Sequence, residues 1–76
     1  MYKLKNEISK MDVEVILALA ECGLSPSRAA RELNVHRNTV LYHIGEIRNY
    51  AGLDPLNFYD MVELLERYKE KKNDER

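Results

Sequence analysis

The chain has 76 residues, a formal net charge of −1 and a single cysteine, Cys22. This length allows one small domain and leaves no room for a catalytic domain beside a binding one. A lone cysteine excludes an internal disulfide, so helix packing or a partner chain must supply the stability. We therefore predict a single domain over residues 1–76, with a homodimer as its expected assembly.

Several classes of protein are excluded by what the sequence lacks. The longest apolar stretch, Val15 to Ala20, is far too short to cross a membrane. An unpaired thiol and the absence of a signal peptide suit a reducing cytoplasm. No nucleophile–base pairing or phosphate-binding glycine loop occurs, and His36 and His43 are too far apart along a helix to share a metal ion. We expect neither an enzyme nor a cofactor, and no small-molecule ligand is evident.

Positive charge is confined to the middle of the chain. Residues 25–52 hold four arginines against two acids, whereas the segments before and after them are each net negative. Because DNA is a polyanion, this polarity favours DNA contact by the middle segment, although the excess of charge is small.

The first two segments are apolar at helical spacing. Residues 1–11 fit either an N-terminal arm or an extra helix, and residues 12–22 predict a helix that Gly23 ends. Its expected core stripe is Val13, Ile16, Leu17 and Ala20. Val15 and Leu19 make its other side apolar too, which favours a cover supplied by a partner.

The next two helices are expected at residues 26–33 and 37–51. Ser25-Pro26 is typical of a helix start, and Gly52 of a helix end. The core face of the first consists of Ala29, Ala30 and Leu33, and that of the second of Val40, Ile44, Ile47 and Ala51. We expect His43 to be partly buried and hydrogen-bonded.

A fourth helix is expected at residues 58–71, with Asn57 as its N-cap. Asp54-Pro55 also has the pattern of an N-cap followed by a first-turn proline. The side chains expected to be buried are Phe58, Met61, Val62, Leu65 and Tyr68. No segment alternates with period two, so the predicted fold is all-α, a helix-turn-helix bundle of four to five helices.

Residues 26–44 carry the pattern of a helix-turn-helix pair. Ala29-Ala30 provides the small residues that two helices need where they cross steeply, and Asn34 tolerates the left-handed conformation of a tight turn. In this motif the N-terminal end of the second helix enters the major groove of DNA. The sequence thus predicts a DNA-binding module.

The run Val35-His36-Arg37-Asn38-Thr39-Val40, followed by Tyr42, Ile47 and Gly52, resembles the C-terminal helix-turn-helix domain of PucR-type and CdaR-type bacterial regulators. That family typically shows Val-His-Arg-Asn-Thr-Leu, then a tyrosine. The similarity covers about residues 12–68, and a more distant one is to the Fis-type module. It implies a bacterial transcription regulator whose DNA-binding domain usually follows an effector-sensing region.

The recognition helix departs from this family in its charge. Where the family is usually rich in arginine, the chain has Leu41, His43, Gly45 and Glu46. Each lost phosphate contact lowers both the affinity and its salt dependence. We therefore expect weak DNA binding by a monomer.

Candidate DNA contacts lie at the starts of the two motif helices and along the second. Arg37 can fork onto guanine and Asn38 can pair with adenine, or either can simply belong to the helix end. Tyr42 is expected to face outward, to reach a phosphate or to pack on the N-terminal arm or a partner. Leu41 is expected to be exposed on the flank of the helix, where it could touch a thymine methyl or mark an interface. The full set is Ser25, Ser27, Arg28, His36, Arg37, Asn38, Thr39, Leu41, Tyr42 and Arg48.

Two functions from different classes follow. The first is sequence-specific binding to double-stranded DNA by a homodimer, whose interface is predicted at Val15, Leu19 and Leu64. The alternative is a protein-interaction module on the same fold with a weakened basic face, favoured by Leu41, Gly45 and the acidic ends of the chain.

Overall fold

The structure, a computed structural model, describes residues 8–74. Four helices form this part of the chain: α1 (Lys10–Glu21), α2 (Pro26–Leu33), α3 (Arg37–Ala51) and α4 (Phe58–Asp74). No strand occurs within residues 8–74, so the predicted all-α class is confirmed. The choice between an arm and an extra helix for residues 1–11 lies mostly outside the described residues, but Lys10 and Met11 already belong to α1.

Helix α1 begins two residues before the predicted start because Ser9 caps it. The Ser9 hydroxyl accepts from the backbone N–H of Asp12 at 3.0 Å, and the Asp12 carboxylate accepts in return from the N–H of Ser9 at 3.5 Å. At the other end Gly23 has φ +69°, the left-handed conformation expected of a residue that stops a helix. Leu24 follows with φ +62°, which the sequence did not predict.

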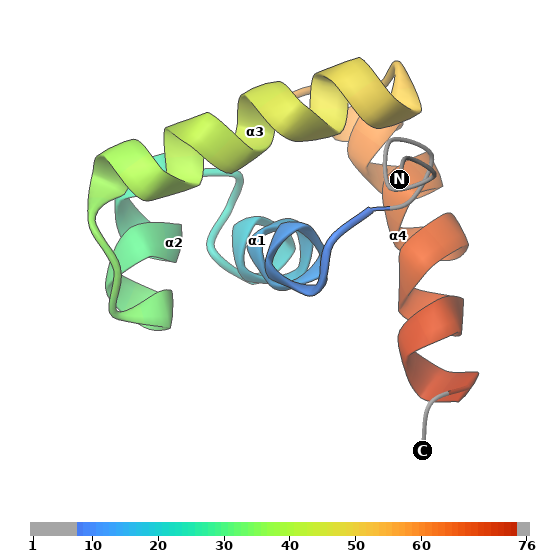
Figure 1. The fold of residues 1–76 in the computed structure, drawn as a ribbon, viewed down its shortest axis with the longest axis horizontal. Helices are drawn as coiled ribbons and strands as arrows, with labels where there is room; N and C mark the ends of the chain where they lie inside the picture. The colour runs from blue at the N-terminus through green and yellow to red at the C-terminus, as the bar shows by residue number, and fades with distance from the viewer. Residues whose placement is uncertain (1–7, 75–76) are drawn as a thin grey trace, which may run out of the picture.

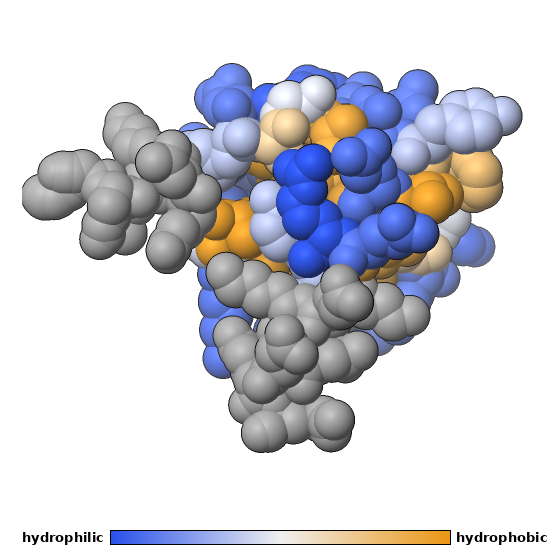
Figure 2. Space-filling model, turned by 90° about the vertical axis from the view of Figure 1, so that its right-hand side faces the viewer, coloured by the Kyte–Doolittle hydropathy of each residue, from blue (hydrophilic) through white to orange (hydrophobic). Residues whose placement is uncertain are grey.

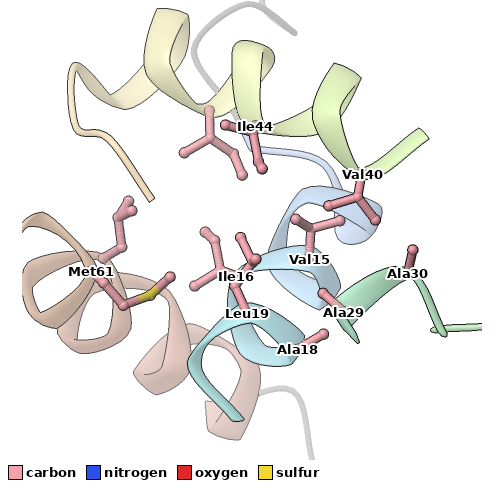
Figure 3. Close-up of a cluster of buried hydrophobic side chains, with 11 residues drawn as sticks. Val15, Ile16, Ala18, Leu19, Ala29, Ala30, Val40, Ile44 and Met61 are labelled. Carbon is pink, nitrogen blue, oxygen red and sulfur yellow. The ribbon is translucent and has the colours of Figure 1, made fainter. Parts of the chain in front are cut away.

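The central position of α1 organises the bundle. Figure 1 shows α1 nearly end-on, with α3 crossing above it, α2 packed on one side and α4 on the other. The core fills the space between them, and Figure 3 shows these side chains converging from all four helices. Its members are Val15, Ile16, Ala18, Leu19, Ala29, Ala30, Val40, Ile44, Ile47, Met61 and Leu64.

The predicted core stripe of α1 is wrong by about a quarter turn. Ile16 is fully buried, but Val13, Leu17 and Ala20 are only half-buried. The buried face runs instead through Asp12, Val15, Ile16 and Leu19, together with Ala18. An almost uniformly apolar helix gives little periodic signal, and a buried aspartate at the start of the stripe hides its true phase.

Helix α4 differs from its prediction in its buried face. Met61 and Leu64 are buried, and Leu65 and Tyr68 are partly buried. Phe58 is 64% exposed and Val62 is 42% exposed, so the expectation that both are core residues is wrong. The view from the α4 side in Figure 2 accordingly shows hydrophobic atoms among hydrophilic ones on the surface.

The connection from α3 to α4 is a turn, not the helix start that Asp54-Pro55 suggested. The Asp54 carboxylate accepts from the N–H of Leu56 at 3.0 Å, and its carbonyl accepts from Asn57 at 2.9 Å. The predicted cap Asn57 is confirmed, since its side chain accepts from the N–H of Asp60 at 3.0 Å.

The dimer interface expected at Val15, Leu19 and Leu64 is contradicted by the structure. All three side chains are 0% exposed in the single chain because α1, α3 and α4 cover them. Fully burying such a side chain contributes about 1.5–3 kcal/mol to folding, and none of that surface is free for a second copy. Within residues 8–74, no helix combines the length and apolar character that crossing a membrane demands.

Candidate nucleic-acid interface

Helices α2 and α3 are joined by a turn of three residues, Asn34, Val35 and His36. Asn34 adopts the predicted left-handed conformation, with φ 60° and ψ 44°. The N–H of Val35 then donates to the carbonyl of Ala30 at 3.0 Å. Ala29 and Ala30 are 0% and 4% exposed, which lets the two helices approach closely. The turn and the small residues therefore hold α3 at a fixed angle to α2.

The first turn of α3 presents three exposed side chains. Nδ1 of His36 accepts from the backbone N–H of Asn38 at 3.2 Å, so His36 is the N-cap of the helix. A neutral imidazole that accepts through Nδ1 carries its proton on Nε2, which is left as a donor. Arg37 and Asn38 are exposed. This end of α3 thus combines hydrogen-bond donors with the positive end of the helix dipole.

The first turn of α2 is built in a similar way. The Ser25 hydroxyl accepts from the N–H of Arg28 at 3.3 Å, and Pro26 occupies the first turn. Ser27 and Arg28 are exposed, whereas Ser25 is half-buried. Among the described residues, Arg28, Arg31 and Arg37 form no salt bridge, so their guanidinium groups are available to an anionic ligand.

The middle of α3 is only partly open. Tyr42 is 63% exposed on the outward face, as predicted. Thr39 and Leu41 are half-buried, and Leu41 packs against the core, so the expectation of an exposed Leu41 on the flank is wrong. Gly45 has no heavy atom within 4 Å of the position where a Cβ would stand, apart from its own helix backbone and chain neighbours. Packing inside the chain therefore does not require glycine at this position.

An acid on α3 changes the electrostatics around two tyrosines. The negative charge of Glu46 and a hydrogen bond to its carboxylate raise the pKa of Tyr42 above 10.0. The pKa of Tyr50 is raised mainly by a hydrogen bond to the same carboxylate. These three residues, with Ile8, Ser9, Asp12 and His43, line a hollow of about 360 Å³ between α3 and the start of α1. Sequence reasoning singled out Tyr42 and Glu46 separately but missed Tyr50.

Arg48 lies at the opposite end of α3 from the other candidates. It is eleven residues beyond Arg37, roughly 16 Å along the helix axis. Its Nε lies 3.3 Å from Oδ1 of Asp54, and the arginine is 52% exposed. Arg48 therefore balances an acid of its own chain and is separated from the cluster at the starts of α2 and α3.

A buried polar pair behind α3 was only half predicted. His43 is 18% exposed and its Nδ1 lies 2.6 Å from Oδ1 of Asp12, which confirms a partly buried, hydrogen-bonded histidine. The partner, Asp12, was missed. Asp12 stands three, four and seven residues before Val15, Ile16 and Leu19 on the buried face of α1, but the sequence does not single out that face because apolar residues surround the helix.

The architecture and the exposed first turn of α3 define a helix-turn-helix domain. Residues 13–65 match the PucR C-terminal helix-turn-helix domain. This stretch covers more than half of the chain, and the chain belongs to that family, a family of DNA-binding regulators. Neither a curated protein nor a solved structure matches it.

Proposed function

We propose that this chain binds double-stranded DNA sequence-specifically as part of a transcription regulator, with the N-terminal half of α3 in the major groove. The observation that carries the proposal is the arrangement of Arg37 and Asn38. Both are exposed on the first turn of a helix whose opposite face is anchored in the core by Val40 and Ile44. A helix held in this way can present side chains to base edges without rearranging the fold.

Each motif helix has its own proposed role. Arg37 is suited to the two acceptors of a guanine, and Asn38 to the acceptor and donor of an adenine. At the start of α2, the side chains of Ser27 and Arg28 and the backbone N–H of Ser27 suit a phosphate, whereas the N–H of Arg28 already donates to Ser25. Nε2–H of His36 and the hydroxyl of Thr39 are further candidate donors to the DNA backbone. The hydroxyl of Tyr42 becomes one if it gives up its hydrogen bond to the carboxylate of Glu46.

The charge available for phosphate contacts is small. Arg28, Arg31 and Arg37 are the arginines of this segment that form no ion pair among the described residues. If Arg28 and Arg31 neutralise phosphates while Arg37 contacts a base, the logarithm of the binding constant falls with the logarithm of salt concentration with a slope of about −2 for each bound copy. Binding by one copy is therefore weak, and a homodimer on two half-sites about 34–36 Å apart would strengthen it.

The test is a fluorescence-anisotropy titration of labelled duplexes at two salt concentrations. A random-sequence pool is first selected for duplexes that the chain retains, and the selected and unselected duplexes are then compared. We expect tighter binding to the selected duplex and a salt slope of about −2 for each bound copy. Equal affinity for both duplexes would contradict sequence-specific recognition.

A second candidate function is a protein-interaction module, and one observation favours it. Phe58 and Tyr59, at the start of α4, are 64% and 80% exposed, and α4 lies on the opposite side of α1 from α2 (Figure 1). Exposed aromatic side chains are enriched where proteins bind one another. Absence of binding to any duplex at low salt would support this alternative over DNA recognition.

A further inference from the structure

Asp12 is the one charged side chain that is buried in the core among the described residues. It is 2% exposed. Its Oδ1 lies 2.6 Å from Nδ1 of His43, and its Oδ2 accepts from the N–H of Ser9 at 3.5 Å. One carboxylate therefore connects the first turn of α1 with the middle of α3, 31 residues further along the chain. Because a carboxylate only accepts, Nδ1 of His43 is the atom that carries the proton of this bond.

Stability alone does not explain the pair. A buried carboxylate loses its hydration, and apolar residues of similar size often replace a buried ion pair without loss of stability. Val15 and Ile16, on the same face of α1 as Asp12, are fully buried apolar side chains, so the interior beside Asp12 accommodates apolar groups. A hydrogen bond requires a particular distance and angle, so the pair restricts the orientation of the two helices in a way that an apolar pair would not.

Direction matters for α3 because the rest of its contact with the core is aliphatic. Val40, Ile44 and Ile47 bury its inner face, and hydrophobic contact is largely insensitive to small rotations. His43 also touches the outward face: its ring lies 5.2 Å from that of Tyr42, at an interplanar angle of 80°. The network therefore runs from the start of α1, through His43, to a side chain proposed to face DNA.

We propose that the Asp12–His43 pair is a positioning device that fixes the rotation of α3 on α1 and thereby aims the side chains of its outward face. The part of this proposal that concerns DNA recognition rests on the function proposed above. The hydrogen bond between the buried Asp12 carboxylate and the His43 imidazole does not depend on DNA binding. His43 acts through the orientation of α3 and not by touching the ligand.

Two substitutions of His43 test whether the position of the donor nitrogen matters, and not only the size of the side chain. In His43→Asn the amide nitrogen takes about the place of Nδ1, whereas in His43→Gln it reaches about the place of Nε2. Glutamine is a better helix former than asparagine, so helix propensity alone would favour His43→Gln, the opposite of the result expected here. We expect His43→Asn to keep most of the preference for the selected duplex over random duplex. His43→Gln should lose roughly tenfold or more of it, the equivalent of a buried hydrogen bond to a charged group.

A second arm needs no DNA. Urea unfolding of Asp12→Ala, His43→Ala and the double variant should show a coupling of roughly tenfold or more in the unfolding equilibrium constant. Long-range proton–nitrogen NMR of the His43 ring should find the proton on Nδ1. Additive effects of the two substitutions, or a ring protonated on Nε2 alone, would overturn the pair.

The DNA-binding measurements and the stability measurements distinguish failure of the positioning role from failure of the proposed function. If the cycle shows coupling but the asparagine and glutamine variants lose duplex preference equally, the positioning role is overturned while the pair stands. If the wild-type chain binds no duplex, the proposed function fails and the aiming of side chains toward DNA fails with it. The cycle and the ring spectrum then still decide whether the pair fixes α3 on α1.

Discussion

Nε of Arg48 lies 3.3 Å from Oδ1 of Asp54, and this ion pair fastens the end of α3 to the turn that precedes α4. Arg37, at the other end of the same helix, has no such partner among the described residues. Two exposed arginines on one helix therefore differ in what they can offer to a DNA phosphate or base. Arg37 is free to bind, whereas Arg48 must first give up a contact within its own chain.

The first prediction compares these two arginines. Arg37→Ala should weaken binding to the selected duplex by ~1–3 kcal/mol and relax the preference at one base pair, without changing the melting temperature. Arg48→Ala should weaken binding by less, since its charge is already balanced, and should cost stability by about 0.2–1 kcal/mol. Anisotropy titrations and thermal melts measure both quantities. An equal or larger loss of binding in Arg48→Ala would mean that DNA contacts the C-terminal end of α3 and not its first turn.

The second prediction concerns the buried face of α4. Leu64 is 0% exposed, so Leu64→Ala should destabilise the fold by about 2–5 kcal/mol. Val62, on the same helix, is 42% exposed, and Val62→Ala should change the stability by about 0.5 kcal/mol or less. Urea unfolding followed by circular dichroism measures both. A larger loss of stability from Val62→Ala than from Leu64→Ala would mean that α4 buries the face that contains Val62, as the sequence suggested.

Leu19 gives a related correction. If Leu19 lay in a dimer interface, as the sequence suggested, Leu19→Glu would disrupt the dimer and leave the helices intact. With Leu19 fully buried, the same substitution places an unpaired carboxylate in the core. We expect loss of helical circular dichroism and of cooperative melting. A folded Leu19→Glu variant that is merely monomeric would contradict the buried position of Leu19.

The helices of the motif were predictable because local chemistry marks both of their ends. Ser25 and Pro26 begin α2, Asn34 ends it in the left-handed conformation, and Gly52 ends α3 with φ 71°. Each of these residues acts through its own backbone or through neighbours within four residues. The sequence therefore contains the information without reference to the tertiary fold.

The faces of α1 and α4 could not be predicted in the same way. Apolar residues surround α1, and which of them is buried depends on where α3 and α4 lie. In α4 the exposed Phe58 and the buried Leu64 have similar hydrophobicity, so only the packing distinguishes them. The Asp12–His43 pair likewise depends on two helices meeting, which no local pattern specifies.

The candidate site was predicted in part for the same reason. The exposure of Arg37, Asn38 and Tyr42 follows from the period of α3 and agrees with the structure. The ion pair of Arg48 and the packing of Leu41 depend on the turn before α4 and on the core. Whether the exposed side chains contact DNA stays a prediction.

The fourth prediction uses Gly45. Because nothing lies within 4 Å of an added Cβ, Gly45→Ala should stabilise the fold by about 0.5–1 kcal/mol through helix propensity. If DNA approaches the outward face closely at this point, the same variant should bind the selected duplex more weakly. Thermal melts and anisotropy titrations measure the two effects separately. Reduced stability of Gly45→Ala would contradict the open space around this residue.

The fifth prediction concerns the tyrosines beside Glu46. The carboxylate keeps the pKa of Tyr42 and of Tyr50 above 10.0. A raised pKa means that the fold favours the neutral phenol, so this contribution to stability is present below pH 10.0 and is lost as the pH rises through the higher folded value. In Glu46→Gln both pKa values should fall toward 10.0, as followed by NMR of the two rings. Tyr59, further away on α4, serves as the internal control.

The central claim is that DNA contacts the starts of α2 and α3. The most direct test is an NMR titration of the chain, labelled with nitrogen-15, with the selected duplex. We predict the largest shifts at Arg28, Arg37, Asn38 and Tyr42, and unchanged signals at the exposed Tyr59 and Val62 of α4. Shifts concentrated on α4, with Arg37 and Asn38 unaffected, would contradict the account.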